Sequence, residues 1–144
     1  PAGARRGGGV TQRKNRVEVG GAEGSPVGAR AAIGYLNDVV GKVGQAASIG
    51  GTKDIHVMAP CPTGWGCGVD ETVDISKDIV DCGLWYLAEY EGGAFKLNRN
   101  PREFASVEAY LRRPGRFKAL TDEDVARVVA ARDAKWEVMR RDWA

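Results

Sequence analysis

The chain has 144 residues, 43% of them hydrophobic and 28% charged, which is typical of one globular domain or of part of a larger one. Its 21 basic and 19 acidic side chains give a formal net charge of +2, too close to neutrality to indicate a polyanionic partner for the whole chain. No run reaches the roughly 20 apolar residues that span a bilayer, and neither a leader nor a disulfide framework is evident, so we expect a cytoplasmic protein without membrane contact.

Residues 1–34 are predicted to be an irregular start. Residues 1–9 hold four glycines and predict an exposed loop, Thr11–Ala22 predicts a weak helix, and Ser25–Ala32 predicts a short strand. Five basic and no acidic side chains lie in residues 1–16, which leaves a nucleic-acid-binding protein as an alternative. That alternative is disfavoured, because this part of the chain has no aromatic side chain on which bases could stack.

Residues 35–100 are predicted to form an α/β core. Apolar residues at helical spacing predict a helix over Leu36–Ser48, and the apolar run Asp54–Ala59 predicts a buried strand. The order strand, helix, strand predicts a βαβ unit with a parallel sheet. Asp70 is a suitable N-cap for a further helix over Glu71–Gly83. The predicted buried face of the first helix consists of Leu36, Val39, Val40, Val43, Ala46 and Ala47.

A hairpin and a helical extension are predicted to follow. Trp85–Tyr90 and Ala94–Leu97 read as the two strands of the hairpin. In the extension, residues 101–144, Ser106 caps a short helix and Thr121 begins the clearest helix of the chain. The apolar stripe of that last helix, which predicts packing on the core or on a partner subunit, consists of Val125, Val128, Val129, Trp136, Met139 and Trp143.

The most distinctive stretch is Ile55–Gly66, which places Cys61 between Pro60 and Pro62, just past the predicted strand. Prolines cannot continue a strand ladder, and ligands collect beyond the carboxyl ends of strands in open α/β sheets. The more common role of a lone cysteine is that of a small buried side chain. The flanking prolines and the glycines on either side of Trp65 instead predict a rigid, irregular loop, which favours Cys61 as a metal or cluster ligand.

Other chemically active side chains are weaker candidates. Cys67 lies in the same loop and Cys82 in the predicted helix, at spacings that match no zinc or two-cysteine redox motif, and we expect Cys82 to be a packed thiol. His56 lies within the apolar strand, which favours a hydrogen-bonded structural role over acid–base catalysis. Trp65 either limits water beside a bound cofactor or anchors the loop, and the sequence leaves both roles open.

The segment His56–Trp65, which reads HVMAPCPTGW, resembles the β subunit of pyruvate:ferredoxin oxidoreductase (pyruvate synthase), in the 2-oxoacid:ferredoxin oxidoreductase family. The resemblance continues through Asp74–Trp85 and is dense from about Tyr35 onward. It implies an α/β fold that is part of a thiamine-diphosphate-binding type, with a mainly parallel sheet flanked by helices. It also implies CoA-dependent oxidative decarboxylation of pyruvate to acetyl-CoA and CO2, with electrons passing through [4Fe-4S] clusters to ferredoxin.

Within this resemblance, Cys61 corresponds to one ligand of a [4Fe-4S] cluster that lies close to thiamine diphosphate, and Trp65 lies near the cluster or the thiamine. Three further cysteines and the Gly-Asp-Gly and Asn pattern that holds Mg²⁺ and the diphosphate have no counterpart here. The resemblance therefore implies the carboxyl-terminal half of the subunit, inactive alone, with other subunits as partners. The alternative is a non-catalytic half-subunit that only assembles with partners.

Overall fold

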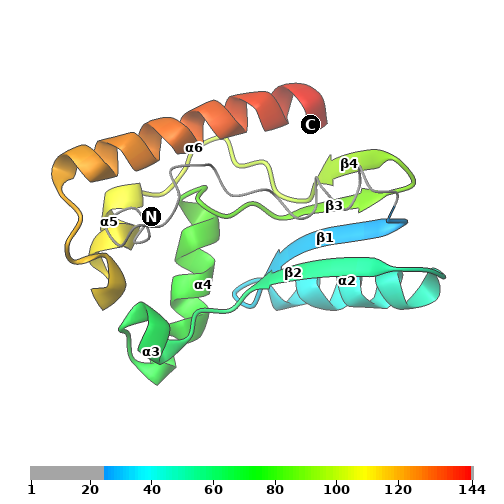
Figure 1. Ribbon diagram of the computed structural model, residues 1–144, viewed down its shortest axis with the longest axis horizontal. Coiled ribbons are helices and arrows are strands. Elements are labelled where there is room, and N and C mark those ends of the chain that lie inside the picture. The colour runs from blue at the N-terminus through cyan, green and yellow to red at the C-terminus, as the bar shows by residue number, and fades with distance from the viewer. Residues whose placement is uncertain (1–24, 144) are drawn as a thin grey trace.

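The computed structural model describes residues 25–143, which form a four-stranded sheet in the order β2-β1-β3-β4 (Figure 1). The strand β1 (Val27–Ala32) pairs in parallel with β2 (Lys53–Met58) and antiparallel with β3 (Ala88–Glu91). The hairpin partner of β3 is β4 (Ala94–Leu97). The predicted α/β class, βαβ unit and hairpin are confirmed, but the sheet is mixed rather than mainly parallel. The helix predicted over residues 11–22 lies outside the described residues.

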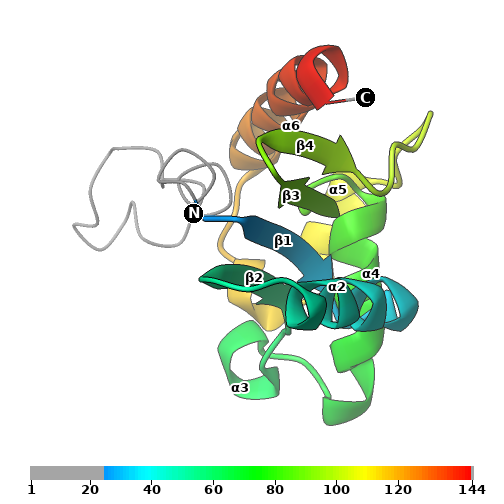
Figure 2. The same ribbon diagram turned by 90° about the vertical axis from the view of Figure 1, so that its right-hand side faces the viewer.

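The helix α2 (Leu36–Ser48) joins β1 to β2 and lies against one face of the sheet (Figure 2). Its predicted bounds are confirmed. Its predicted buried face is confirmed at Ala46 but wrong at Leu36 and Val40, which are exposed, and Lys42 is buried instead. Lys42 tolerates burial because its Nζ donates to the carbonyl of Arg30 over 2.8 Å and pairs with Asp38 over 2.7 Å. Burial lowers the pKa of Lys42, and the hydrogen bond to Asp38 acts in the opposite direction by favouring the charged ammonium.

The strand β2 is an edge strand, so the prediction of a buried strand is wrong. Lys53 and His56 are exposed and its other four residues are half-buried, because β1 is its only neighbour within residues 25–143. His56 is exposed, and its ring stands edge-on to Trp85 at 4.8 Å between centroids. Apolar residues on this strand therefore reflect a half-covered surface.

The helix α4 (Thr72–Asp81) follows a short 3-10 turn, η2 (Val69–Glu71). Asp70 was predicted to be the N-cap of this helix, and that prediction is wrong. Asp70 lies inside η2, and the N-cap of α4 is Glu71. The carboxylate of Glu71 instead accepts the Gly68 N–H over 2.8 Å. One face of α4 is buried in the larger core cluster, whose members include Ile75, Ile79, Val80, Trp85, Leu87, Val107, Tyr110, Leu111 and Val125.

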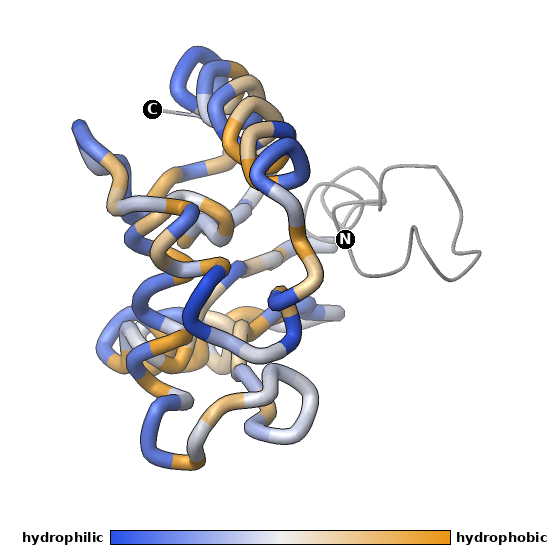
Figure 3. The backbone as a smooth tube through the Cα atoms, turned by 90° about the vertical axis from the view of Figure 1, so that its left-hand side faces the viewer, coloured by the Kyte–Doolittle hydropathy of each residue, from blue (hydrophilic) through white to orange (hydrophobic). Residues whose placement is uncertain are grey.

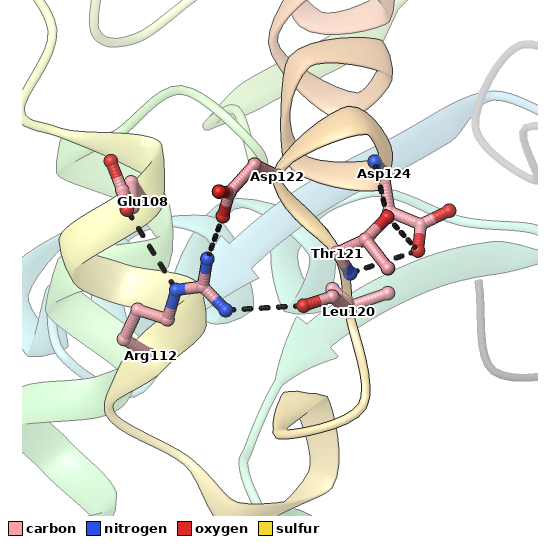
Figure 4. A network of polar contacts seen from close by, with 6 residues as sticks. All are labelled: Glu108, Arg112, Leu120, Thr121, Asp122 and Asp124. Carbon is pink, nitrogen blue, oxygen red and sulfur yellow. Dashed lines mark hydrogen bonds and ion pairs between the residues drawn. The ribbon is translucent and has the colours of Figure 1, made fainter.

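The extension contains α5 (Val107–Arg112), a 3-10 turn η3 (Gly115–Phe117) and α6 (Asp122–Trp143). Both predicted caps are confirmed. Ser106 Oγ accepts the Ala109 N–H over 3.1 Å, and Thr121 and Asp124 exchange backbone-to-side-chain hydrogen bonds at the start of α6 (Figure 4). The pKa of Asp124 is held below its usual range, first by the hydrogen bond from the Thr121 N–H. Arg112 joins α5 to α6 through Asp122 and the Leu120 carbonyl.

The long helix α6 packs on this chain's own sheet. Hydrophilic and hydrophobic residues alternate along it (Figure 3), and its buried residues Trp136 and Met139 join Tyr86 and Ala88 in a second core cluster. The indole N–H of Trp136 donates to the Gly83 carbonyl over 2.7 Å. Of the two predicted uses of this stripe, core packing is therefore the one found.

Candidate functional site

The loop that carries Cys61 leaves the sheet at the carboxyl ends of the parallel strands. We call residues 59–67 the Pro-Cys-Pro loop. The hydroxyl of the buried Ser76 donates to the Met58 carbonyl and accepts the Gly34 N–H, both over 3.1 Å. This side chain on α4 thus ties together the ends of β1 and β2, and the loop starts from that junction (Figure 1). The predicted place of Cys61, just past a strand end, is confirmed.

Cys61 is the N-cap residue of the short helix α3 (Pro62–Trp65), and its carbonyl accepts the Trp65 N–H over 2.8 Å. Pro62 stands in the first turn, where a missing N–H costs nothing. The Cys61 side chain is exposed and forms no disulfide. The common role of a lone cysteine as a buried apolar side chain is therefore excluded, and the thiol is open to a group that approaches from outside these residues.

The far end of the Pro-Cys-Pro loop is fixed by a glycine pair that sequence reasoning missed. Gly66 has a left-handed backbone, with φ at 67°, and its carbonyl accepts the Gly115 N–H over 3.0 Å. A Cβ at Gly66 would lie 3.2 Å from the Gly115 Cα. Glycine at both positions is therefore required for the loop and η3 to approach this closely. The glycine before a turn is visible in the sequence, but its partner 49 residues later is not.

Trp65 anchors the Pro-Cys-Pro loop to the extension. Its indole N–H donates to the Tyr110 hydroxyl over 3.3 Å, and the Arg116 guanidinium lies 4.8 Å from the ring centroid. Burial raises the pKa of Tyr110 to about 12, so this hydroxyl stays protonated at neutral pH. Anchoring is thus one role of Trp65 that the geometry supports, and its placement near a cofactor stays a prediction.

The other two cysteines face inward. Cys67 is half-buried and packs against the larger core cluster, whereas Cys82 is fully buried. The Cys82 thiol donates to the Ile79 carbonyl over 3.5 Å, and burial raises its pKa to about 11. The prediction of a packed thiol at Cys82 is confirmed. Among the three cysteines, only Cys61 is an exposed residue.

Ion pairs hold the start of α4 to α5 beside the loop. Arg113 pairs with Asp78 over 2.5 Å, with Glu71 over 3.3 Å and with Asp74 over 3.8 Å. The pKa of Arg113 is raised above its ordinary value, first by its hydrogen bond to Asp78. This cation therefore links three acidic side chains, which would otherwise repel one another on one helical surface.

A metal site cannot be completed from the residues that the structure describes. Within residues 25–143, no group of three or more histidine, cysteine, aspartate or glutamate side chains is placed to hold a metal ion. A [4Fe-4S] cluster needs four ligands, usually thiolates, so Cys61 fits the role of one ligand only. None of the helices in this range is long and apolar enough to cross a membrane. The basic residues 1–16, on which the nucleic-acid alternative rests, lie outside the described part.

Known proteins can be aligned with most of this chain at about one third identity. Pyruvate synthase subunit PorB of Methanocaldococcus jannaschii is 36% identical over 139 residues, which cover 96% of this chain and 47% of the relative. Ketoisovalerate oxidoreductase subunit VorB of Pyrococcus furiosus is 34% identical over 131 residues, covering 90% of this chain and 42% of the relative. Pyruvate synthase subunit PorB of Thermotoga maritima is 34% identical over 143 residues, which cover 99% of this chain and 44% of the relative. The chain thus spans about half the length of the curated relatives it matches. No protein-family model matches it.

Proposed function

We propose that this chain, whose resemblance to the β subunits of 2-oxoacid:ferredoxin oxidoreductases is confirmed by its relatives, supplies one thiolate ligand to an iron-sulfur cluster of such an enzyme. The observation that carries the proposal is the exposed Cys61 thiol on a braced loop at the carboxyl edge of the sheet. When bound, a [4Fe-4S] cluster accepts and passes on single electrons. The remaining ligands would come from segments outside residues 25–143.

The residues around Cys61 would fix where its sulfur stands. Pro60 and Pro62 limit the backbone on both sides of the cysteine, and the bond between Gly66 and Gly115 closes the loop. Ligand loops that are held before metal binds lose little conformational entropy when it does. The function of the surrounding loop is therefore to orient one thiolate.

The reaction we propose for the complete enzyme is the CoA-dependent oxidative decarboxylation of pyruvate to acetyl-CoA and CO2, with ferredoxin as the electron acceptor. Pyruvate is chosen because pyruvate synthase subunits are among the relatives at 36% identity. Thiamine diphosphate and Mg²⁺ would be held by other segments, since this sequence has no Gly-Asp-Gly segment for them. Alone, the chain should have no decarboxylase activity.

The test is the substitution Cys61→Ser in the assembled holoenzyme, with Cys67→Ser as the matched control from the same loop. We expect Cys61→Ser to lower the iron content and the cluster signal in electron paramagnetic resonance, and to abolish ferredoxin reduction by pyruvate. Cys67→Ser should leave all three measurements near those of the unchanged enzyme. Unchanged iron content in the Cys61→Ser enzyme would refute the ligand role.

A second candidate is a non-catalytic half-subunit that only assembles with partners. It is favoured by one observation, that Cys61 is the only exposed residue among the three cysteines, whereas a [4Fe-4S] cluster needs four ligands. Native mass spectrometry of the assembly separates the two, because the catalytic proposal requires companions that carry thiamine diphosphate and further cluster ligands. An assembly without either cofactor would favour the second candidate.

A further inference from the structure

One side of α6 is exposed along its whole length. The helix lies along the outside of the molecule, and its buried residues Val125, Trp136 and Met139 face inward (Figure 1, Figure 2). At 3.6 residues per turn, the exposed residues on the opposite side gather on one surface, which we call the outer α6 face. Its members are Glu123, Ala126, Arg127, Ala130, Ala134, Glu137, Val138 and Arg141.

The middle of the outer α6 face is small and apolar. Ala126, Ala130 and Ala134 are exposed, and Val138 is 42% exposed. The side of a helix that faces away from the core usually carries charged or polar residues. Small side chains let two helices approach closely, because the distance between helix axes depends on the side chains at the contact. This part of the face is therefore suited to a second helix with equally small side chains.

Charged side chains flank the small residues in the same order at both ends. Glu123 precedes Arg127 near the start of α6, and Glu137 precedes Arg141 near its end. A second α6 helix that ran parallel would place each charge beside its own copy, acid against acid and base against base. An antiparallel helix reverses the order, so that each acid can meet a base.

An antiparallel pair of α6 helices, with its two-fold axis level with residue 132, matches the whole outer face. Each facing pair then occurs twice, once on either side of the axis. Two of the pairs join opposite charges, and two join small apolar side chains. The four pairs between one copy and the other are Glu123 with Arg141, Arg127 with Glu137, Ala130 with Ala134, and Ala126 with Val138.

The ion pairs within α6 are compatible with this arrangement. Arg127 pairs with Glu123 over 3.6 Å and with Asp124 over 2.5 Å, and Arg141 pairs with Asp142 over 2.7 Å. The two arginine side chains are 68% and 72% exposed, and exposed ion pairs contribute little to stability. A guanidinium has five N–H donors, so each arginine keeps donors for a carboxylate on a second helix.

We propose that the outer α6 face binds the same face of a second copy of this chain, antiparallel, in a two-fold symmetric dimer. Charge complementarity selects this occupant, because a face with two acids and two bases in this order is complementary to its own reversed copy. A partner of a single charge sign would leave half of these side chains facing like charge. The inference goes beyond the proposed function, since it concerns how two copies assemble and not what Cys61 binds.

The test uses the charge reversals Glu123→Arg and Arg141→Glu in the full chain, with sedimentation velocity over a range of concentrations. The unchanged chain should dimerise. In a dimer of either variant alone, like charges meet at both ends, so the dissociation constant should rise about tenfold or more. An equimolar mixture of the two variants should dimerise as the unchanged chain does, because every end pair again joins an acid to a base.

Asp70→Arg is the matched control, because it makes the same change in charge at an exposed residue of η2. It should leave the dissociation constant unchanged, and a loss as large as that of Glu123→Arg would overturn the proposal. If Glu123→Arg does not fold, as judged by circular dichroism, Arg127→Glu and Glu137→Arg supply the second charge pair for the same experiment.

Three other outcomes would overturn the proposal. The first is an unchanged chain that stays monomeric up to about 1 mM. The second is a dimer that neither reversal weakens, which would place the contact elsewhere on the chain. The third is a mixture of the two variants that associates no more tightly than each variant alone, which would exclude the antiparallel register. Because sedimentation is measured without iron, unchanged iron in Cys61→Ser would refute the proposed function alone.

Discussion

Replacing Gly66 by alanine tests the brace on the Pro-Cys-Pro loop. A left-handed backbone costs a residue with a Cβ roughly 1–2 kcal/mol. The new Cβ would also lie 3.2 Å from the Gly115 Cα, a contact with backbone that cannot swing away. The smaller entropy of the unfolded alanine chain offsets about 0.4–1 kcal/mol. These two figures leave a cost of about 0–1.6 kcal/mol, and the close contact adds to it. We therefore expect Gly66→Ala to lower the free energy of unfolding by about 1–2 kcal/mol.

Gly64→Ala, two residues earlier, is the matched control. Gly64 lies inside α3, and a Cβ there would meet only the Cys61 Cβ at 3.7 Å, an ordinary contact. This variant should gain about 0.5–1 kcal/mol because alanine is favoured in helices. The midpoints of urea unfolding should then differ by about 1 M between the two variants. Equal midpoints would refute the argument that the left-handed Gly66 holds the loop against η3.

Three further predictions follow from the side chains around the site. Burial, followed by a hydrogen bond to Asp81, raises the pKa of Tyr35 from 10.0 to about 12. The protonated side chain therefore stabilises the fold at neutral pH, and this stabilisation is lost as the pH rises from 10 to 12. Between pH 10 and 12 the urea midpoint of Tyr35→Phe should fall less than that of the unchanged chain, in which Tyr35 adds to the decline caused by Tyr110 and Cys82. An equal fall in both would contradict this prediction. Arg113→Met should cost about 1 kcal/mol at low salt and less in 1 M NaCl; equal losses would exclude ion pairing. Iodoacetamide should label Cys61 first and Cys82 only on unfolding, as followed by mass spectrometry.

The elements of the fold were largely predictable because their signals are local. Helical spacing over residues 36–48, the hairpin glycines and the caps at Ser106 and Thr121 each act within a few residues. The burial of α2 was not predictable in the same way. Its apolar face is broader than the part that this sheet covers, and Lys42 replaces an apolar residue by using the Arg30 carbonyl, a contact made only in three dimensions.

The candidate site was predicted in part. The prolines around Cys61 predicted a rigid loop beyond a strand, because proline acts on its own backbone. The groups that brace this loop, Ser76, Tyr110 and Gly115, were missed, because each is brought to it by tertiary packing from a distant part of the chain. The mixed sheet was likewise missed, since nothing in residues 85–97 indicates that the hairpin joins β1 antiparallel.

The dependence of the loop on Tyr110 and Gly115 has a consequence for the order of events during biosynthesis. A ribosome delivers Cys61 well before it delivers these two residues, and domains acquire their packing as the chain emerges. Until then the thiol would sit on an unbraced stretch of nascent polypeptide. If Cys61 binds iron as proposed, the cluster should be inserted only after the carboxyl-terminal helices have been synthesised. The proteins that insert clusters would then act on the folded chain and not on the nascent one.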